Sequence, residues 1–349
     1  MSDATPRTGD LGMNPEEVEA LRQAVSDLRR DIEQRFGTHP SSGDRRSHRL
    51  GLADRAGVGL RSRLERFGVG ELYRGLRNAA AVFGMLGMRE HSVEVDAFGM
   101  DPFYLDDARI LLDFLYDRWW RVQVSGGENL AQPGRVIFVA NRSGILPYDG
   151  LMIAHAAERV SPGRQRPRFL VADWIATLPF FQPRIARLGG VRACPENAER
   201  LLRDGHQIVV FPEGKKGALK PFSERYRLQR FARGGFVSLA LRLNATVIPT
   251  AVVGAEEAHP VLFRPVFPSR LLGMPIPITP TFPLMGPLGL IPLPSQWRIC
   301  FGEPIRWTQD DRRKADDALF INRTRDRIRS TIQSHLEEEI RRRTGVFSA

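Results

Sequence analysis

The sequence has little cysteine, which excludes two common ways of stabilising a chain. Cys194 and Cys300 are the only two cysteines among its 349 residues. A disulfide framework needs several cysteine pairs, and a structural zinc site needs about four ligands. The first residues also lack the apolar run of a secretory signal peptide, so we expect a protein of a reducing compartment.

No apolar segment is continuous enough to cross a membrane as a helix. The longest candidate, Leu271–Gln296, holds no charged residue over 26 positions, which exceeds the roughly 20 residues that a helical span needs. Seven prolines, from Pro275 to Pro294, would remove backbone donors where no water can replace them. We therefore expect an extended apolar loop here and no transmembrane helix.

Positive charge is abundant: 51 lysines and arginines against 40 acidic residues give a net charge of +11. Such a charge favours an acidic partner, either anionic lipid headgroups or nucleic acid, unless it reflects only an arginine-rich composition. Between residues 38 and 77 the arginines are not interleaved with aromatic residues, and no nucleic-acid-reading motif is present. We therefore expect an anionic membrane surface as a partner and no nucleic acid.

Helix and linker patterns flank the core. Residues 1–37 are predicted to hold a helix that starts at Asn14–Glu17, with apolar residues in a heptad-like spacing over Val18–Ile32. A helix this short is marginal in water, so it would pair with a second copy, giving a homodimer, or dock on the main domain. Residues 38–95 are predicted to form a basic, mobile linker, and residues 311–349 a C-terminal helix.

Strand-like and helix-like segments alternate between residues 96 and 310. Short apolar runs predict strands at Arg121–Val124, Val136–Ala140, Arg168–Ala172, Gln207–Phe211, Thr246–Val253 and Trp297–Gly302. Amphipathic stretches predict a helix that starts at Asp101–Pro102 and further helices at Leu151–Val160, Glu196–Asp204 and Arg233–Leu243. This alternation predicts an α/β fold, in which a largely parallel sheet is covered by helices.

Two of these strands lead directly into polar loops. Val136–Ala140 is followed by Asn141–Asp149, and Gln207–Phe211 is followed by Pro212–Lys216. Parallel strands present their carboxyl ends at one edge of a sheet, where α/β proteins place their reactive groups. We therefore expect both loops to face one cleft.

These segments resemble the glycerolipid acyltransferase family, whose bacterial members acylate glycerol 3-phosphate and lysophosphatidate. Asn141-Arg142-Ser143 with Asp149 is similar to the family's first motif, Asn-His-x-Ser-x-x-Asp, and Phe211–Gly214 reads as its third, Phe-Pro-Glu-Gly. Val247–Val252 resembles the fourth, a strand centred on proline. The longer interval before Asp149 fits a bacterial branch with the form Asn-His-Ser-Gly-x-Leu-Pro-x-Asp-Gly. The resemblance runs from about Val122 to Pro304.

One position departs from the family, because its catalytic histidine falls on Arg142. In the family this histidine accepts the proton of the acceptor hydroxyl as it attacks a thioester, and the aspartate, here Asp149, orients it. Arginine stays protonated at neutral pH, since its pKa is above about 12. Arg142 can instead hold a phosphate or carboxylate, or form a plain ion pair with Asp149 that fixes the loop.

The resemblance implies a set of site residues. Arg142, Ser143 and Asp149 would form the catalytic corner, although Asp149 is a poor base because a carboxyl pKa lies near 4. Lys216 falls where the family has a phosphate-binding arginine, and the run Lys220–Arg233 looks like a rim for a headgroup or coenzyme phosphate. The substrate-binding residues implied are Asn141, Phe211, Pro212, Glu213, Gly214, Lys215, Lys216 and Arg225.

Other positions are weaker candidates for the site. The family's second motif is matched poorly around Arg192. His155 lies on the helix after Asp149, where a lone histidine is usually structural. His206 and His259 precede and follow predicted strands without a convincing acidic partner nearby. No metal site is predicted.

The resemblance implies a peripheral enzyme on the inner face of the cytoplasmic membrane. It would move a fatty acyl group from acyl-CoA or acyl carrier protein, as co-substrate, to a glycerol-phosphate or lysophospholipid hydroxyl in phospholipid synthesis. No cofactor is implied. Two alternatives stay open: a catalytically degenerate member that binds lipid or acyl thioester without turnover, and a basic membrane scaffold dimerised through Val18–Ile32. Leu271–Gln296 could enter the membrane interface, roof an acyl tunnel or pack over the sheet edge.

Overall fold

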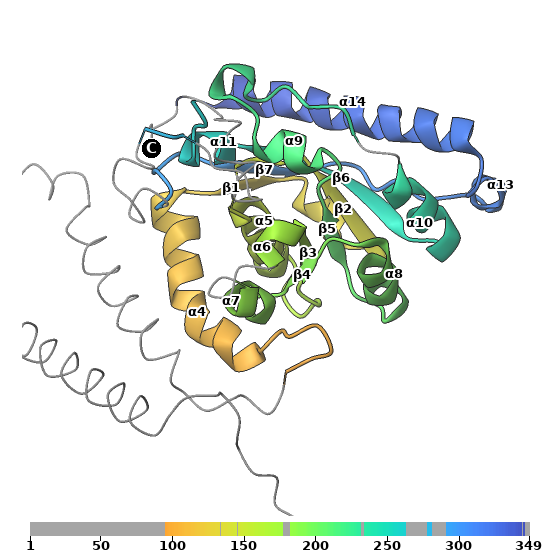
Figure 1. Cartoon of the computed structure of the whole chain (residues 1–349), viewed down its shortest axis with the longest axis horizontal. Helices are drawn as coiled ribbons and strands as arrows, with labels where there is room; N and C mark the ends of the chain where they lie inside the picture. The colour runs from red at the N-terminus through yellow and green to blue at the C-terminus, as the bar shows by residue number, and fades with distance from the viewer. Residues whose placement is uncertain are drawn as a thin grey trace, which may run out of the picture. The chain divides into compact units, whose positions relative to one another are not determined.

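The computed structural model describes residues 95–132, 134–144, 146–176, 182–231, 234–262, 278–280, 291–343 and 345 (Figure 1). All of them belong to the second of two units in the chain, Arg74–Ala349. The predicted N-terminal helix (residues 1–37) and the predicted linker, apart from its last residue, lie outside the described residues. So does most of the apolar segment Leu271–Gln296.

Seven strands of the described chain form one sheet, in the order β1-β7-β6-β2-β5-β3-β4. Every neighbouring pair is parallel except β6 and β7, which are antiparallel. This confirms the predicted α/β fold with a largely parallel sheet. The strands are β1 (Gln123–Ser125), β2 (Val136–Ala140), β3 (Arg168–Val171), β4 (Gly190–Arg192), β5 (Ile208–Val210), β6 (Thr246–Val253) and β7 (Arg298–Phe301).

Strand β4 was not predicted, and its residues explain why. It has three residues and begins with a glycine, so it has neither an apolar run nor an alternating pattern. A Cβ on Gly190 would stand 2.4 Å from Cγ2 of Ile185 and 2.9 Å from Cε2 of Phe169. The glycine is therefore needed for a close approach between β4, its neighbouring strand and the preceding helix, which no local pattern reveals.

Helices cover both faces of the sheet. They are α4 (Pro102–Phe114), α5 (Tyr148–Val160), α6 (Asp173–Ala176), α7 (Gln182–Arg187), α8 (Pro195–Arg203), α9 (Gly214–Ala218), α10 (Gly235–Leu243), α11 (Ala255–Ala258), α13 (Gln309–Arg313) and α14 (Ala318–Arg342). Two 3-10 turns, at Gly127–Leu130 and Phe222–Glu224, and a π-helical turn at Leu115–Trp119 complete the described elements. Asp101 caps α4 by accepting from Tyr104 N, which confirms the predicted start of that helix.

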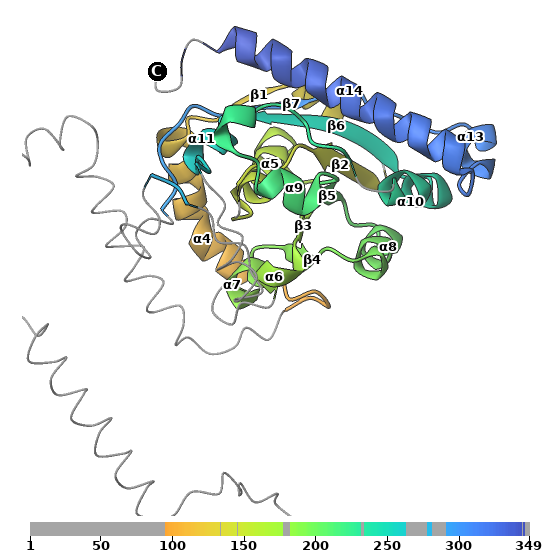
Figure 2. The ribbon, with the colours of Figure 1, turned by 45° about the horizontal axis from the view of Figure 1, so that its top comes forward.

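Alternate residues of the strands belong to two different hydrophobic cores. In β2, Phe138 packs with residues of α4 and α5, whereas Ile137 and Val139 pack with residues of α8, α10 and α14. The two groups of helices accordingly lie on different sides of the strands (Figures 1 and 2). All five residues of β2 are buried, as expected for a central parallel strand.

The C-terminal helix α14 is part of the second core. Ile328, Ile332 and Leu336 are fully buried within it, and the helix lies along β6 (Figure 2). It begins at residue 318 because the Asp317 side chain accepts from the backbone N–H groups of Leu319 and Phe320. No helix in the described ranges is long and apolar enough to cross a membrane.

The described end of the apolar segment is packed against the domain. The Ser295 hydroxyl donates to the carbonyl of Gly254 (3.0 Å), and the Trp119 indole donates to the carbonyl of Pro292 (3.0 Å). Ser295 and Gln296 are buried. Residues 291–296 thus cover the start of α11. That the rest of Leu271–Gln296 enters the membrane interface, roofs an acyl tunnel or packs over the sheet edge stays a prediction.

Candidate active site at the ends of β2 and β5

The loops after β2 and β5 leave the sheet side by side. The two strands are parallel neighbours, with Val139 paired to Val210. Their carboxyl ends therefore bring Asn141–Asp149 next to Phe211–Lys216, as parallel strand geometry predicts. We call these two loops the first corner and the second corner.

Asn141 fastens the first corner to β6. Its side-chain amide donates to the carbonyl of Val252 (2.9 Å), and the Val252 N–H donates to Asn141 Oδ1 (2.7 Å). The residue is fully buried. Both the oxygen and the nitrogen of its amide are thus hydrogen-bonded to the backbone of β6. This predicted substrate-binding residue therefore has a structural role.

Asp149 lies in the first turn of α5, whose observed start at Tyr148 is three residues earlier than predicted. Its Oδ1 accepts from Arg142 Nη1 (2.5 Å) and from Gly150 N (2.8 Å). Its Oδ2 accepts from Ser143 N (2.9 Å) and, at 3.4 Å, from the Ser143 hydroxyl. Burial raises the pKa of Asp149, while the Arg142 guanidinium and the hydrogen bonds act to lower it.

The predicted catalytic residues Arg142, Ser143 and Asp149 therefore come together, in a closed arrangement. The side chain of Arg142 is 5% exposed and that of Asp149 is fully buried. The guanidinium also lies over the ring of Phe211, 4.9 Å from its centroid, which joins the first corner to the second. An ion pair of this kind is held firmly because either charge left alone would be costly to bury.

Glu213 ties the two corners together. Its Oε1 accepts from the backbone N–H of Arg142 (2.8 Å), and its Oε2 accepts from the backbone N–H of Gln229 (2.6 Å). Lys220 Nζ lies 3.7 Å from Glu213 Oε2 and 2.9 Å from Glu256 Oε1. Burial raises the pKa of both Glu213 and Glu256, and Lys220 opposes this. The carboxylate of Glu213 is therefore turned inward.

The second corner turns outward at its two lysines. Gly214, Lys215 and Lys216 are exposed, and they line a pocket of about 460 Å³ together with Pro212, Glu213, Arg230, Phe231 and Arg325. Gly217 allows this arrangement, because a Cβ there would stand 2.6 Å from Cβ of Glu213 and 2.9 Å from Cβ of Arg142. The pocket is cationic and lies next to the first corner.

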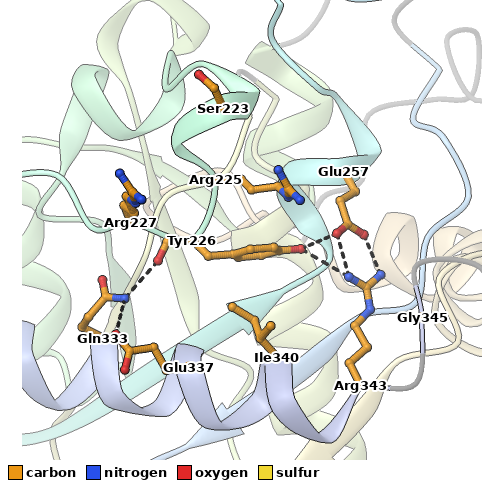
Figure 3. Close-up of a pocket in the computed structure, with 10 residues that line it drawn as sticks. All are labelled: Ser223, Arg225, Tyr226, Arg227, Glu257, Gln333, Glu337, Ile340, Arg343 and Gly345. Atoms are coloured by element: carbon orange, nitrogen blue, oxygen red, sulfur yellow. Dashed lines mark hydrogen bonds and ion pairs between the residues drawn. The ribbon is translucent and has the colours of Figure 1, made fainter.

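Arg225 is separated from these lysines. It lines another pocket, of about 520 Å³, with Tyr226, Glu257, Arg343 and residues of α14 (Figure 3). Tyr226 donates its hydroxyl to Glu257 Oε1 (2.7 Å), and Arg343 binds both oxygens of Glu257, at 2.7 and 2.6 Å. Of the predicted substrate-binding residues, Arg225 alone lines this pocket and not the one beside Lys215 and Lys216.

A histidine that the sequence left unassigned lies against the first corner. His259 follows α11, and its ring stacks on Tyr148 with centroids 5.7 Å apart and planes at 5°. A Cβ placed on Gly144 would stand 3.7 Å from Cβ of His259. The contact joins residues far apart in the chain, so no local pattern could have indicated it.

Two weaker candidates have structural surroundings. His155 is buried and its Nε2 lies 2.9 Å from Asp113 Oδ1; burial lowers its pKa. Arg192, near the poorly matched second motif, is exposed on β4 and pairs with Asp173 (2.8 Å). Within the described ranges, no group of three or more His, Cys, Asp or Glu side chains is arranged to hold a metal.

Comparisons with known proteins bear on these corners. The family model described as Acyltransferase matches residues 121–253, which include both corners. An uncharacterized protein of Mycobacterium tuberculosis is 45% identical over 271 residues, 77% of this chain and 76% of the relative. One of Mycobacterium leprae is 44% identical over 274 residues, 78% of this chain and 75% of the relative.

Two further similarities are shorter or more distant. Phytyl ester synthase 2 of Arabidopsis thaliana is 33% identical over 70 residues, 20% of this chain and 10% of the plant protein. The crystal structure of the 1-acyl-sn-glycerophosphate acyltransferase of Thermotoga maritima aligns with a TM-score of 0.42 and 16% identity, over 69% of this chain and 83% of that one.

Proposed function

Because this chain belongs to the acyltransferase family, we propose that it moves a fatty acyl group from a thioester to a hydroxyl of a glycerolipid. The donor would be acyl-CoA or acyl carrier protein, and the acceptor glycerol phosphate or a lysophospholipid. The observation that carries the proposal is the cationic pocket of about 460 Å³ beside the first corner. Lys215 and Lys216 line it and are exposed, as contacts to a phosphate require.

In the proposed reaction, the acceptor hydroxyl oxygen attacks the thioester carbonyl carbon. A carbon–oxygen bond forms, the carbon–sulfur bond breaks, and the hydroxyl proton ends on the departing thiol. The chain would contribute by fixing both substrates at the two corners, since positioning alone can supply roughly 7–11 kcal/mol. The inward side chains of Asn141, Asp149 and Glu213 support this by holding the corners rigid.

A second candidate function is favoured by one observation. Arg142 occupies the position of the family's catalytic histidine and is locked to Asp149 at 2.5 Å. A corner closed in this way could bind lipid or acyl thioester without turnover. The third possibility, a scaffold dimerised through Val18–Ile32, rests on residues outside the described ranges and stays a prediction.

The proposed place of action is an anionic membrane surface. The net charge of +11 favours attraction to anionic lipid, at about 1 kcal/mol for each basic residue near the surface. Sedimentation with vesicles tests this directly. We expect the protein to bind vesicles containing phosphatidylglycerol and to remain free with purely zwitterionic vesicles, and equal binding to both would contradict the electrostatic argument.

The reaction is tested with labelled acyl-CoA and acyl carrier protein as donors, in the presence of anionic vesicles. Glycerol 3-phosphate and lysophosphatidate would serve as phosphorylated acceptors, and a monoacylglycerol as the unphosphorylated control. We expect kcat/KM to be at least about tenfold higher for the phosphorylated acceptors, which corresponds to one charge-assisted contact. Saturable binding of lysophosphatidate with no transfer from either donor would favour the second candidate.

A further inference from the structure

The first corner holds no group that can accept the proton of an attacking hydroxyl. The guanidinium of Arg142 carries only N–H donors and no acceptor atom. Asp149 is fully buried, and its two oxygens already accept from Arg142, Gly150 and Ser143. A carboxylate that is enclosed and saturated in this way does not meet the acceptor. If the chain transfers acyl groups, its base comes from another element.

His259 is brought to the first corner by the strand that Asn141 fastens. Asn141 exchanges two hydrogen bonds with Val252 near the end of β6, and α11 follows directly. The chain is held again just before the histidine, because the N–H of Leu293 donates to the carbonyl of Ala258 (2.8 Å). Two separate fastenings thus fix the backbone that carries His259 relative to the first corner.

The ring of His259 is oriented by a column of aromatic side chains. It stacks on Tyr148, Tyr148 meets Trp120 edge-on with centroids 5.4 Å apart, and Trp120 stacks on Trp297 at 4.3 Å. The Trp297 indole in turn donates to the Ser295 hydroxyl (3.0 Å). Trp120 and Trp297 are fully buried, whereas Tyr148 and His259 are partly exposed. Of these two, only the imidazole of His259 has a nitrogen that can accept a proton near neutral pH.

His259 also lies near both flanks of the first corner. Tyr148 directly precedes Asp149, and Gly144 directly follows Ser143. Gly144 has φ +71°, a left-handed conformation that glycine adopts without strain, and a Cβ built there would lie 3.7 Å from Cβ of His259, at van der Waals contact distance. His259 therefore lies beside Gly144 and Tyr148, which flank Ser143 and Asp149.

We propose that His259 is the catalytic base of this chain and stands in for the histidine that Arg142 displaces. The proposal rests on the acyl transfer proposed above. The imidazole accepts the hydroxyl proton as the oxygen attacks the thioester carbonyl carbon. As the carbon–sulfur bond breaks, the imidazolium returns that proton to the leaving thiolate, so that the histidine ends neutral. Arg142 and Asp149 then serve as positioning residues that fix the first corner beside His259.

The acidic groups of the neighbouring elements are bound to other residues, and the neighbouring tyrosine is neutral. On α11, Glu256 binds Lys220 and the Tyr226 N–H, and Glu257 binds Arg343 and the Tyr226 hydroxyl. On the first corner, Asp149 binds Arg142. On α5, burial raises the pKa of Tyr148 to about 12, so its phenol is neutral and does not act as a base near neutral pH.

The test compares wild type with His259→Gln in the full chain, using the donors and vesicles described above. His206→Gln is the matched control, since His206 is a partly exposed histidine at the amino-terminal side of β5. We expect His259→Gln to lower kcat by about 10²–10⁴-fold and to leave KM within about threefold. The control should keep the wild-type kcat, and both variants should keep the wild-type Tm.

A pH profile separates a base from a residue that only packs. We expect kcat of the wild type to show an ionisation step between pH 5 and 8, the range of histidine chemistry, and we expect this step to disappear in His259→Gln. A purely structural role would lower Tm and alter KM while keeping that step. Retention of the step, or of more than half of the wild-type kcat, would overturn the assignment of His259 alone. A wild type that transfers nothing would overturn the proposed acyl transfer and this assignment with it.

Discussion

The two corners of the site use the same kinds of residue in opposite ways. In the first corner, the arginine and the aspartate turn inward, bind each other and are nearly inaccessible. In the second corner, the carboxylate of Glu213 turns inward but Lys215 and Lys216 face a pocket. Some residues of these motif loops therefore stabilise the loop itself, whereas others remain available to a ligand.

This division follows from what comes after each strand. β2 and β5 are both fully buried, so polar side chains just beyond their ends, Glu213 included, find partners inside the protein. Asn141 and Asp149 find them in Val252, Arg142 and Ser143. The second corner enters the short helix α9, whose surface is exposed at Lys215 and Lys216.

The largest effect is expected from breaking the buried pair of the first corner. Asp149→Ala would leave Arg142 as an uncompensated buried charge, and we expect it to lower the free energy of unfolding by about 3–5 kcal/mol. Chemical denaturation measures this. The double variant Arg142→Met with Asp149→Leu removes both charges and should recover most of the loss. A single variant that loses less than about 1 kcal/mol would show that the pair is not buried as described.

A smaller loss is expected at the fastening of the first corner to β6. Asn141→Leu keeps the number and branching of the side-chain heavy atoms but leaves the Val252 N–H and carbonyl without the partners seen here. We expect a loss of about 1–3 kcal/mol in the free energy of unfolding. Asn197→Leu is the control, because the Asn197 amide makes a solvent-exposed bond to the Arg192 carbonyl; it should change stability by less than about 0.5 kcal/mol.

The second corner should respond in binding and not in stability. The double variant Lys215→Ala with Lys216→Ala should leave the free energy of unfolding within about 0.5 kcal/mol, since both side chains are exposed. It should raise KM for a phosphorylated acceptor about tenfold and leave KM for the acyl donor unchanged. The variant with two arginines is the control and should stay near wild type. An unchanged KM would remove the second corner from acceptor binding.

The smallest effect concerns the pH dependence of stability at the link between the corners. Burial raises the pKa of Glu213 and Glu256, so the folded protein keeps a proton that the unfolded chain has released above its ordinary glutamate pKa. This contribution to stability is present below the unfolded pKa and is lost as the pH rises through the folded pKa. Glu256→Gln should flatten that decline in denaturation series, whereas the exposed-surface change Glu338→Gln should not.

The sequence predicted the parts of the fold that depend on local pattern. The limits of β2 and β6 were predicted without error because β2 is a continuous apolar run and β6 is a long, mostly apolar one. The start of α5 was placed three residues late, because Gly150 reads as the end of a loop. In the structure Gly150 lies inside the helix, where a Cβ would stand 2.8 Å from Cβ of Phe169. That requirement comes from packing, which a single sequence does not reveal.

The sequence predicted which two loops lie together at the candidate site, but not how their side chains are oriented. The motif residues do lie together at the ends of β2 and β5, but the inward orientation of Glu213 depends on N–H groups of Arg142 and Gln229. Arg225 was predicted to bind substrate together with Lys215 and Lys216, yet it lines the pocket against α14 (Figure 3). The sequence did not indicate His259, because its contact with Tyr148 joins residues far apart in the chain.

The central claim is that the chain transfers acyl groups although Arg142 stands in place of the family's histidine. The most direct measurement is acyl transfer from labelled acyl-CoA to lysophosphatidate by purified wild type and Arg142→His, side by side with anionic vesicles present. We expect the wild type to transfer the acyl group without a histidine at position 142. An inert wild type, together with turnover gained by Arg142→His, would contradict it and identify the native protein as a binding member of the family.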